Sequence, residues 1–207
     1  MPKLPEPPPV AELVRIGSDV YAVPAKTRLW RIYFRGGDHP VRWSDFRAFG
    51  PTNSRFDHHL LPKAVQDRKI LYASQHGETA FAEVFQDGRV IDRFRNQPWL
   101  VAFDVVSAIN LLDLTGNWPT RAGASMTINS GPRPRARQWS QHIYAAYPDI
   151  SGLWYASSMD ANRPAIALYE RAEHTMPDRP VFNRSLADGA LASMIVRAAK
   201  RFGYSVL

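Results

Sequence analysis

Short apolar and aromatic runs mix with helical segments, without strict alternation, along this chain of 207 residues. Period-two spacing and β-branched or aromatic content predict strands at 28–34, 69–74, 99–106, 109–115, 152–158 and 165–170. Apolar stripes at helical spacing predict helices at 10–16, 76–86 and 135–147 and a final helix that ends at Phe202. This mixture favours one α+β domain, with twisted mixed or antiparallel sheets and flanking helices, over a doubly wound parallel sheet.

The residue types that are missing exclude several classes of protein. The chain has no cysteine, which excludes a disulfide framework, a cysteine-ligated zinc site and a thiol nucleophile. No apolar run approaches the length of a membrane span. The N-terminus also lacks the basic start and apolar stretch of a secretory signal. We therefore expect a cytoplasmic protein that does not associate with membranes.

The formal charge of +7 comes mainly from arginine, which supplies 21 of the 26 basic residues. A guanidinium group binds phosphate and carboxylate in bidentate fashion, so the composition suggests a polyanionic partner: a nucleic acid, a nucleotide or an acidic protein. A GC-rich genome would produce the same bias. Three arginines, Arg133, Arg135 and Arg137, lie at the start of a predicted helix, where cations oppose the helix dipole. Solvent, an anionic ligand or an acidic protein could compensate them.

The N-terminal segment differs in composition from the rest of the chain. Its first nine residues, MPKLPEPPP, contain five prolines, which favour an extended conformation and interrupt helices. We expect residues 1–27 to form a disordered or wrapping tail with a short helix, and residues 28–207 to form the folded domain. Within that domain, residues 36–59 are predicted to form a long loop, and a loop of this length is more often functional than idle.

Most standard catalytic motifs are missing from the sequence. There is no GxxxxGK[ST], GxGxxG, HExxH or GxSxG, so the usual phosphate loops, zinc-protease helices and hydrolase nucleophile elbows are not expected. Asp57-His58-His59 is a possible metal cluster, but adjacent histidines on a loop rarely face one ion, and no second cluster at zinc spacing exists. We expect no metal.

A series of short motifs is more specific in combination than each motif is alone. In chain order they read WRIY (30–33), SRFD (54–57), LYAS (71–74), AFAEVF (80–85) and WYASSMDANRP (154–164). The series, from about Arg28 to Glu170, resembles the RES domain family, which is named for its arginine, glutamate and serine. The resemblance implies a fold like that of ADP-ribosyltransferases. It also implies a toxin of a prokaryotic toxin–antitoxin pair, which consumes NAD and is blocked by a helix-turn-helix antitoxin.

Carried over onto this sequence, the resemblance implies Arg31, Glu83 and Ser157 as the catalytic residues. Arg55 matches a second family arginine, and Tyr72 matches the family tyrosine. Many relatives have Gly-Gly-Arg-Trp-Asn around that second arginine, whereas this chain has Asn53-Ser54-Arg55-Phe56-Asp57 and lacks both flexible glycines. Ser157 follows the family pattern better than Ser158, and the choice between the two stays open.

The chemistry of these residue types agrees with NAD as the substrate. Arg31 and Arg55 can hold the pyrophosphate through charge-assisted hydrogen bonds, and Tyr72 or Tyr33 can stack on the cationic nicotinamide ring. Cleavage of the nicotinamide–ribose bond builds oxocarbenium character, which the carboxylate of Glu83 can stabilise. Ser157 could hydrogen-bond the nicotinamide amide or a ribose hydroxyl.

We therefore expect an NAD glycohydrolase, phosphorylase or mono-ADP-ribosyltransferase that passes ADP-ribose to water, phosphate or a target protein. The expected partners are NAD, an antitoxin and any modified protein, with nucleic acid contacted only through the antitoxin. Two other interpretations remain open: a basic toxin that binds nucleic acid or cleaves RNA, and an interaction module without catalysis. The candidate residues also have plain structural interpretations, such as an ion-paired arginine, a core tyrosine or a solvated glutamate.

Overall fold

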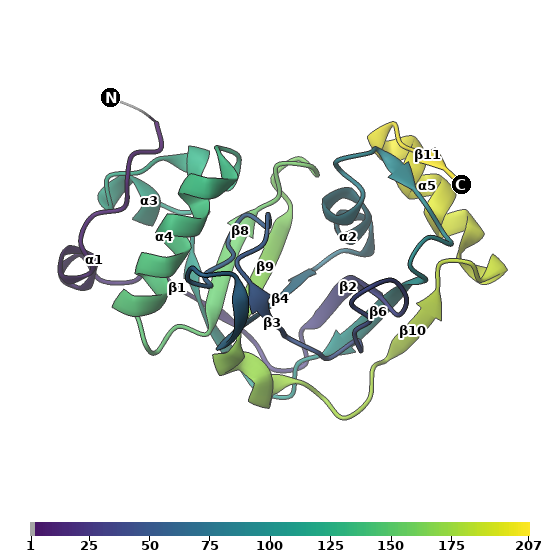
Figure 1. The fold of residues 1–207 in the computed structure, drawn as a ribbon, viewed down its shortest axis with the longest axis horizontal. Helices are drawn as coiled ribbons and strands as arrows, with labels where there is room; N and C mark the ends of the chain where they lie inside the picture. The colour runs from purple at the N-terminus through teal and green to yellow at the C-terminus, as the bar shows by residue number, and fades with distance from the viewer. Residues whose placement is uncertain (1–2) are drawn as a thin grey trace.

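The computed structural model describes residues 3–207, so the first two residues of the predicted tail lie outside the described residues. The described part of the chain forms a nine-stranded mixed sheet in the order β1-β7-β8-β9-β4-β2-β6-β10, with β3 paired to β4 (Figure 1). Its strands are β1 Val20–Val23, β2 Arg28–Phe34, β3 Arg47–Gly50, β4 Ala64–Ser74, β6 Pro98–Asp104, β7 Ile109–Asp113, β8 Gly152–Ala156, β9 Pro164–Tyr169 and β10 Phe182–Ser185. The helices are α1 Val10–Ile16, α2 Gly77–Val84, α3 Trp118–Arg121, α4 Arg133–Ala146 and α5 Ala192–Phe202. A separate parallel pair joins β5 Val90–Ile91 to β11 Ser205–Val206.

The predicted α+β class is confirmed, and most predicted elements are present within a few residues of their expected ends. The long loop is interrupted by β3, which pairs with β4. Sequence analysis missed β1 and β10, since both are four-residue edge strands with little alternation. Among the described helices, none has the length and apolar character needed to span a membrane.

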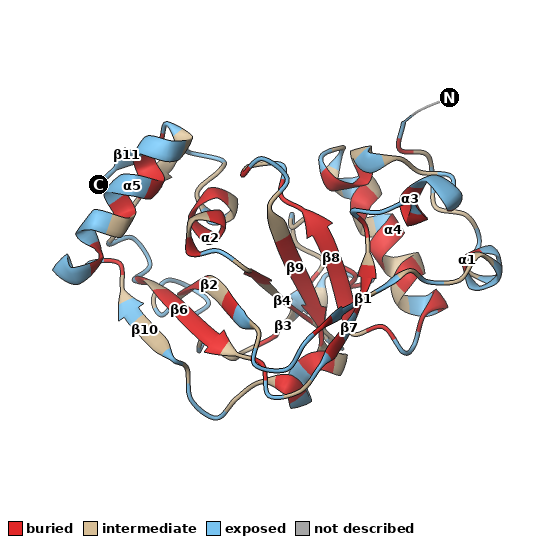
Figure 2. Cartoon of the chain, turned by 180° about the vertical axis from the view of Figure 1, so that it is seen from behind, coloured by how far each residue is buried: buried red, intermediate tan, exposed pale blue. Residues whose placement is uncertain are grey.

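The sheet is nearly divided between β4 and β2. Within residues 3–207, Trp30 and Ser74 are the single residue pair that joins these strands, whereas β2 and β6 pair along seven residues. Helices α1, α3 and α4 cover the half that contains β7, β8, β9 and β4, and α2 and α5 cover the half that contains β2 and β6 (Figure 1). Figure 2 shows β8 buried along its length and β9 buried beyond its first residue. The division leaves α2 at the opening between the halves.

Strand alternation gives the sheet a second buried face. On β4, Ile70 belongs to the core under α4, whereas Leu71 and Ala73 belong to a core on the opposite face. On β2, Ile32 packs under α2 and α5, whereas Leu29 joins the opposite core. Because side chains along a strand alternate between the two faces, each residue of β2 and β4 lies on one face or the other. Candidate residues can therefore meet only where they share a face.

The proline-rich N-terminal segment wraps along α4. Leu4 is buried in the core under α4. The indole Nε1 of Trp139 donates to the carbonyl of Pro5 at 2.9 Å, and Arg135 forms a 2.9 Å ion pair with Glu6. His142 Nδ1 lies 2.9 Å from the carbonyl oxygen of Pro8. These contacts show a wrapping segment rather than a disordered one over the residues described.

Shortening Leu4 should therefore weaken the fold. Leu4→Ala removes a side chain that is 8% exposed, and we expect the free energy of unfolding to fall by about 2 kcal/mol. Urea denaturation followed by circular dichroism measures the change. The matched control is Leu61→Ala, because Leu61 is 82% exposed and the same truncation there should leave the free energy unchanged to within about 0.5 kcal/mol. Equal effects of the two substitutions would contradict a packed N-terminal segment.

Candidate active site

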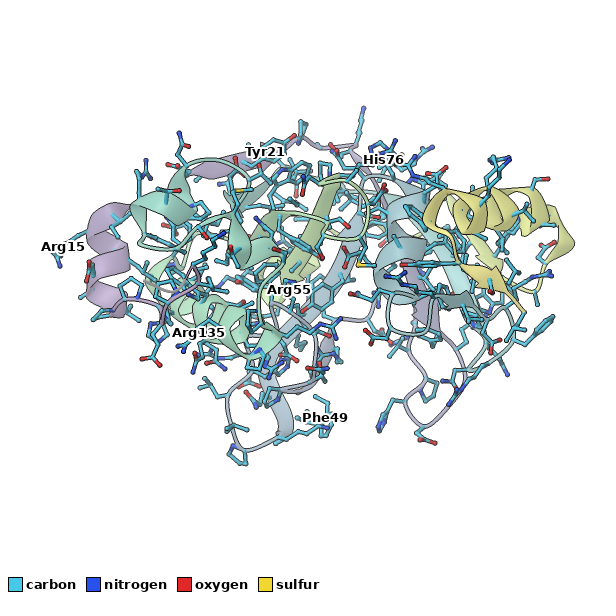
Figure 3. All side chains as sticks on the ribbon, turned by 90° about the horizontal axis from the view of Figure 1, so that it is seen from above. Arg15, Tyr21, Phe49, Arg55, His76 and Arg135 are labelled. Atoms are coloured by element: carbon cyan, nitrogen blue, oxygen red, sulfur yellow. The ribbon has the colours of Figure 1, made fainter. Side chains whose placement is uncertain are left out.

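A cavity of about 400 Å³ opens beside the end of α2, over β4 and β8 and next to the start of α4. This volume lies in the range of small-molecule sites. The cavity is lined by Thr52, Asn53, Ser54, Arg55, Tyr72, Glu83, Val84, Gln86, Asp87, Asn129, Arg133, Tyr155 and Ser158. In Figure 3, Arg55 lies in the middle of the molecule, between the half that carries α4 and the half that carries α2. The cavity therefore joins three candidate residues, Arg55, Tyr72 and Glu83, that are far apart in sequence.

Glu83 stands at the edge of the apolar stripe of α2, where Ala80 and Phe81 are buried against the sheet. Ser157, which directly follows β8, donates its hydroxyl proton to Glu83 Oε1 at 2.5 Å. Burial raises the pKa of the Glu83 carboxyl, and the Ser157 hydrogen bond and the charges of Arg55 and Arg133 offset part of the increase. The site thus holds a carboxyl group whose proton is released at higher pH than that of an exposed glutamate.

The hydroxyl of Ser157 both donates and accepts hydrogen bonds. Its Oγ accepts hydrogen bonds from the backbone N–H groups of Met159, at 3.2 Å, and Asp160, at 3.1 Å, while donating to Glu83. Of the two adjacent serines, Ser157 is fully buried and Ser158 lines the cavity. The geometry ties Ser157 to Glu83, and of the two serines only Ser158 borders the cavity.

Arg55 extends from the loop that follows β3. Its Nη1 donates to the carbonyl oxygen of Gly131 at 2.5 Å. Burial lowers the pKa of Arg55, and the negative charge of Glu83 counteracts the effect. A guanidinium group has five N–H donors, so most of the donors of Arg55 remain available at the cavity wall.

Two tyrosines form the aromatic part of the cavity wall. Tyr72 pairs with Ala167 and Tyr155 pairs with Ala165, so both rings stand on the same face of the sheet with small β9 residues between them. The hydroxyl oxygen of Tyr72 is buried and has no hydrogen-bond partner among residues 3–207. An unsatisfied buried hydroxyl is costly, and its place in the cavity wall suits a ligand that supplies the missing partner.

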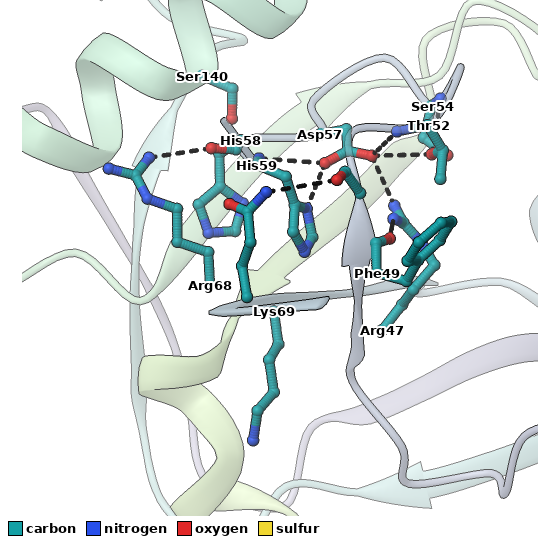
Figure 4. Close-up of polar contacts among 12 residues, drawn as sticks. Arg47, Phe49, Thr52, Ser54, Asp57, His58, His59, Arg68, Lys69 and Ser140 are labelled. Carbon is teal, nitrogen blue, oxygen red and sulfur yellow. Dashed lines mark hydrogen bonds and ion pairs between the residues drawn. The ribbon is translucent and has the colours of Figure 1, made fainter. Parts of the chain in front are cut away.

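The loop that carries Arg55 is anchored by the buried carboxylate of Asp57 (Figure 4). Asp57 Oδ2 accepts from Thr52 N at 2.6 Å and from Arg47 Nη2 at 2.9 Å, and Oδ1 lies 2.5 Å from His59 Nδ1. Burial alone would raise the pKa of Asp57, but the His59 hydrogen bond and the charge of Arg47 lower it well below its usual range. In the described part of the chain no three acidic or histidine side chains are grouped for a metal. The hydrogen bonds of Asp57 to Thr52, Arg47 and His59 order this loop.

Arg31 and Tyr33 lie on the other face of the sheet from this cavity. They alternate on β2 with Trp30 and Ile32, which pack under α2. Arg31 Nη1 donates to the backbone carbonyls of Trp43, at 2.9 Å, and Asp45, at 3.0 Å, and burial lowers its pKa to about 10. Tyr33 donates to Asn183 Oδ1 at 3.1 Å. The structure therefore brings together Arg55, Tyr72, Glu83 and Ser157 and does not bring Arg31 or Tyr33 to them.

Several residues that line the cavity were not among the predicted site residues, and Asn129, Tyr155 and Arg133 are three of them. Asn129 lies in a segment read as loop, and its side chain donates to the carbonyl of Leu114 at 3.0 Å. Tyr155 belongs to the motif at 154–164, but within that motif the site residue was predicted to be Ser157 or Ser158. Arg133 was part of the basic patch, and its unfavourable position at a helix start was the available signal.

Asp160 ties the Ser157 turn to two helices. Its buried carboxylate accepts from Thr79 Oγ1 of α2 at 2.7 Å and forms a 2.7 Å ion pair with Arg201 of α5. Thr79 is one helical turn before Glu83, so the Thr79–Asp160 and Glu83–Ser157 contacts form two successive links between α2 and the turn. Asp160 therefore holds the turn in register with α2.

Replacing Asp160 should destabilise the protein. Asp160→Ala leaves Thr79 and Arg201 without their acceptor, and we expect a loss of about 2 kcal/mol in the free energy of unfolding, measured by urea denaturation. Arg184→Gln breaks the exposed ion pair to Asp188 and should cost less than about 0.5 kcal/mol. A loss as small for Asp160→Ala as for this control would show that the buried link contributes nothing.

Three comparisons with known proteins place the chain. The sequence matches the RES domain over residues 28–187, which is 160 of the 207 residues. The comparison with curated proteins found no match. A chain in the crystal structure of the M. tuberculosis MbcT–MbcA toxin–antitoxin complex shares the fold, with a TM-score of 0.54 at 13% sequence identity, over 84% of this chain and 89% of that chain. Motif order, cavity and domain match agree: this chain belongs to the RES domain family.

Proposed function

We propose that this protein is the toxin of a toxin–antitoxin pair and that it cleaves NAD at the nicotinamide–ribose bond. Membership of the RES domain family supports the proposal, as does the shared fold with a chain from a toxin–antitoxin complex. The observation that carries the enzymatic part is the contact of the Ser157 hydroxyl with the Glu83 carboxyl at 2.5 Å, beside a cavity that also holds Arg55 and two tyrosines. The substrate and the expected antitoxin would both be met in the cytoplasm.

In the proposed reaction Arg55 binds the NAD diphosphate through the donors that Gly131 leaves free. The faces of Tyr72 and Tyr155 suit the cationic nicotinamide ring. The C–N bond breaks, nicotinamide leaves with the electron pair, and the ribose carbon gains positive character that the Glu83 carboxylate stabilises. An acceptor, which is water, phosphate or a protein side chain, then adds to that carbon and loses its proton.

In this proposal Ser157 orients the carboxylate of Glu83. A hydroxyl that is itself fixed by two backbone N–H groups holds Oε1 in one position before substrate binds. Preorganised groups of this kind stabilise developing charge without reorganisation during the reaction.

Glu83→Gln should abolish NAD turnover while preserving the fold, because the amide keeps the shape of the side chain but carries no negative charge. Purified protein is incubated with NAD, with and without phosphate, and products are resolved by mass. Wild-type protein should release nicotinamide, and the mass of the second product identifies the acceptor. Wild-type activity in Glu83→Gln would remove the glutamate from the mechanism. Intact NAD both in buffer and in cell lysate, combined with salt-dependent RNA binding, would favour the nucleic-acid interpretation instead.

The pH dependence of NAD turnover tests the Ser157–Glu83 contact. The reaction needs the charged carboxylate, so activity falls as pH drops through the pKa of Glu83, which burial raises. The Ser157 hydrogen bond favours the charged form, and Ser157→Ala should shift the acidic limb of the kcat/KM profile to higher pH. Ser193→Ala, at an exposed position on α5, is the matched control and should leave the limb in place. An unmoved limb in Ser157→Ala would contradict the orienting role.

A further inference from the structure

We propose that Arg133 is the second arginine that holds the substrate diphosphate, opposite Arg55. The inference rests on the proposed NAD-cleaving function and assigns a ligand-binding role to a side chain at the start of α4. Both guanidinium groups line the cavity that contains Glu83.

The position of Arg133 makes it part of the cavity wall. It is the first residue of α4, and its side chain is 24% exposed. Its Nη2 donates to Gln86 Oε1 at 3.0 Å and lies 3.3 Å from Asp87 Oδ1. Gln86 and Asp87 follow directly after α2, so Arg133 spans from α4 to the end of the helix that carries Glu83.

The donors of Arg133 are largely unused. In residues 3–207 its Nε and Nη1 make no hydrogen bond, and its carboxylate partner Asp87 has a side chain that is 82% exposed. An ion pair to so exposed a carboxylate contributes little. The contacts with Gln86 and Asp87 hold the guanidinium through Nη2 and leave the N–H groups of Nε and Nη1 for a ligand.

The neighbouring arginines Arg135 and Arg137 do not line the cavity. Arg135 pairs with Glu6, and Arg137 donates to Asn53 Oδ1 at 3.4 Å. The first turn of α4 contains no acidic residue to compensate its cations, although such residues are favoured at a helix start. Among the three arginines of the patch, Arg133 is the one that lines the cavity.

Two guanidinium groups at one cavity repel each other unless an anion lies between them. The charge of Arg133 contributes to the lowered pKa of Arg55, and both arginines help to offset the raised pKa of Glu83. Glu83 is hydrogen-bonded to Ser157, and Arg55 donates to a backbone carbonyl, so no carboxylate forms a hydrogen bond to Arg55 within the described residues. A diphosphate carries two adjacent negative charges and matches two facing guanidinium groups.

Arg31 is not available for this task. It lies on the opposite face of the sheet and donates to the carbonyls of Trp43 and Asp45. A diphosphate site on the Glu83 side therefore needs its second cation from another element, and α4 supplies it.

Binding of ADP-ribose in phosphate-free buffer, measured by calorimetry, tests the inference. Arg133→Gln should weaken binding about tenfold, which corresponds to about 1.4 kcal/mol, and raise the KM for NAD with little change in kcat. Arg133→Lys should keep part of the affinity, because it retains the charge but not the planar fork. Arg135→Gln is the matched control, since Arg135 pairs with Glu6 outside the cavity, and it should bind ADP-ribose like the wild type.

Unchanged ADP-ribose affinity in a folded Arg133→Gln protein would overturn the inference, and so would an equal loss in Arg135→Gln. A lowered affinity for inorganic phosphate alone, with ADP-ribose binding intact, would assign Arg133 to an acceptor phosphate and would also overturn it. These results differ from failure of the proposed function. In that case the wild-type protein itself would neither bind ADP-ribose nor consume NAD.

Discussion

The narrow contact between β2 and β4 determines how the rest of the molecule is arranged. Trp30 and Ser74 join the strands, and beyond this pair the two half-sheets separate. Helix α2 enters the opening, and its first residue, Gly77, lies against the Trp30 ring, where a Cβ atom would be in van der Waals contact at 3.4 Å. This contact seats the start of α2 on β2, and Glu83, near the end of the helix, lines the cavity.

Three carboxyl groups lie near this opening, and their surroundings give each a different role. Asp57 accepts from Arg47, Thr52 and His59 and orders the Arg55 loop. Asp160 accepts from Thr79 and Arg201 and holds the Ser157 turn. Glu83 receives one hydroxyl hydrogen bond and lines the cavity, and burial raises its pKa, whereas the pKa of Asp57 is lowered. Environments that push carboxyl pKa values apart separate structural groups from a reactive one.

Local sequence patterns predicted the helices and strands that carry the site residues, but they did not predict how these elements pack against one another. The spacing of Ala80 and Phe81 was enough to put Glu83 at the edge of a helix, and the strand at 28–34 was predicted with its observed ends. Period-two alternation also separates Arg31 from Trp30, but it does not say which face α2 covers. That choice depends on packing between segments distant in sequence. For the same reason Arg133 could be recognised as an unusual helix start but not as a neighbour of Glu83.

The N-terminal segment shows how far such packing extends. Leu4 lies against Gly131, where a Cβ atom would come within 3.1 Å of the leucine and 2.8 Å of Thr127. Glycine at this position therefore lets the segment approach the turn before α4. The carbonyl of the same Gly131 accepts the hydrogen bond of Arg55. Gly131 thus contacts both Leu4 and Arg55. The cavity wall therefore depends on the N-terminal segment, which composition alone would classify as a tail.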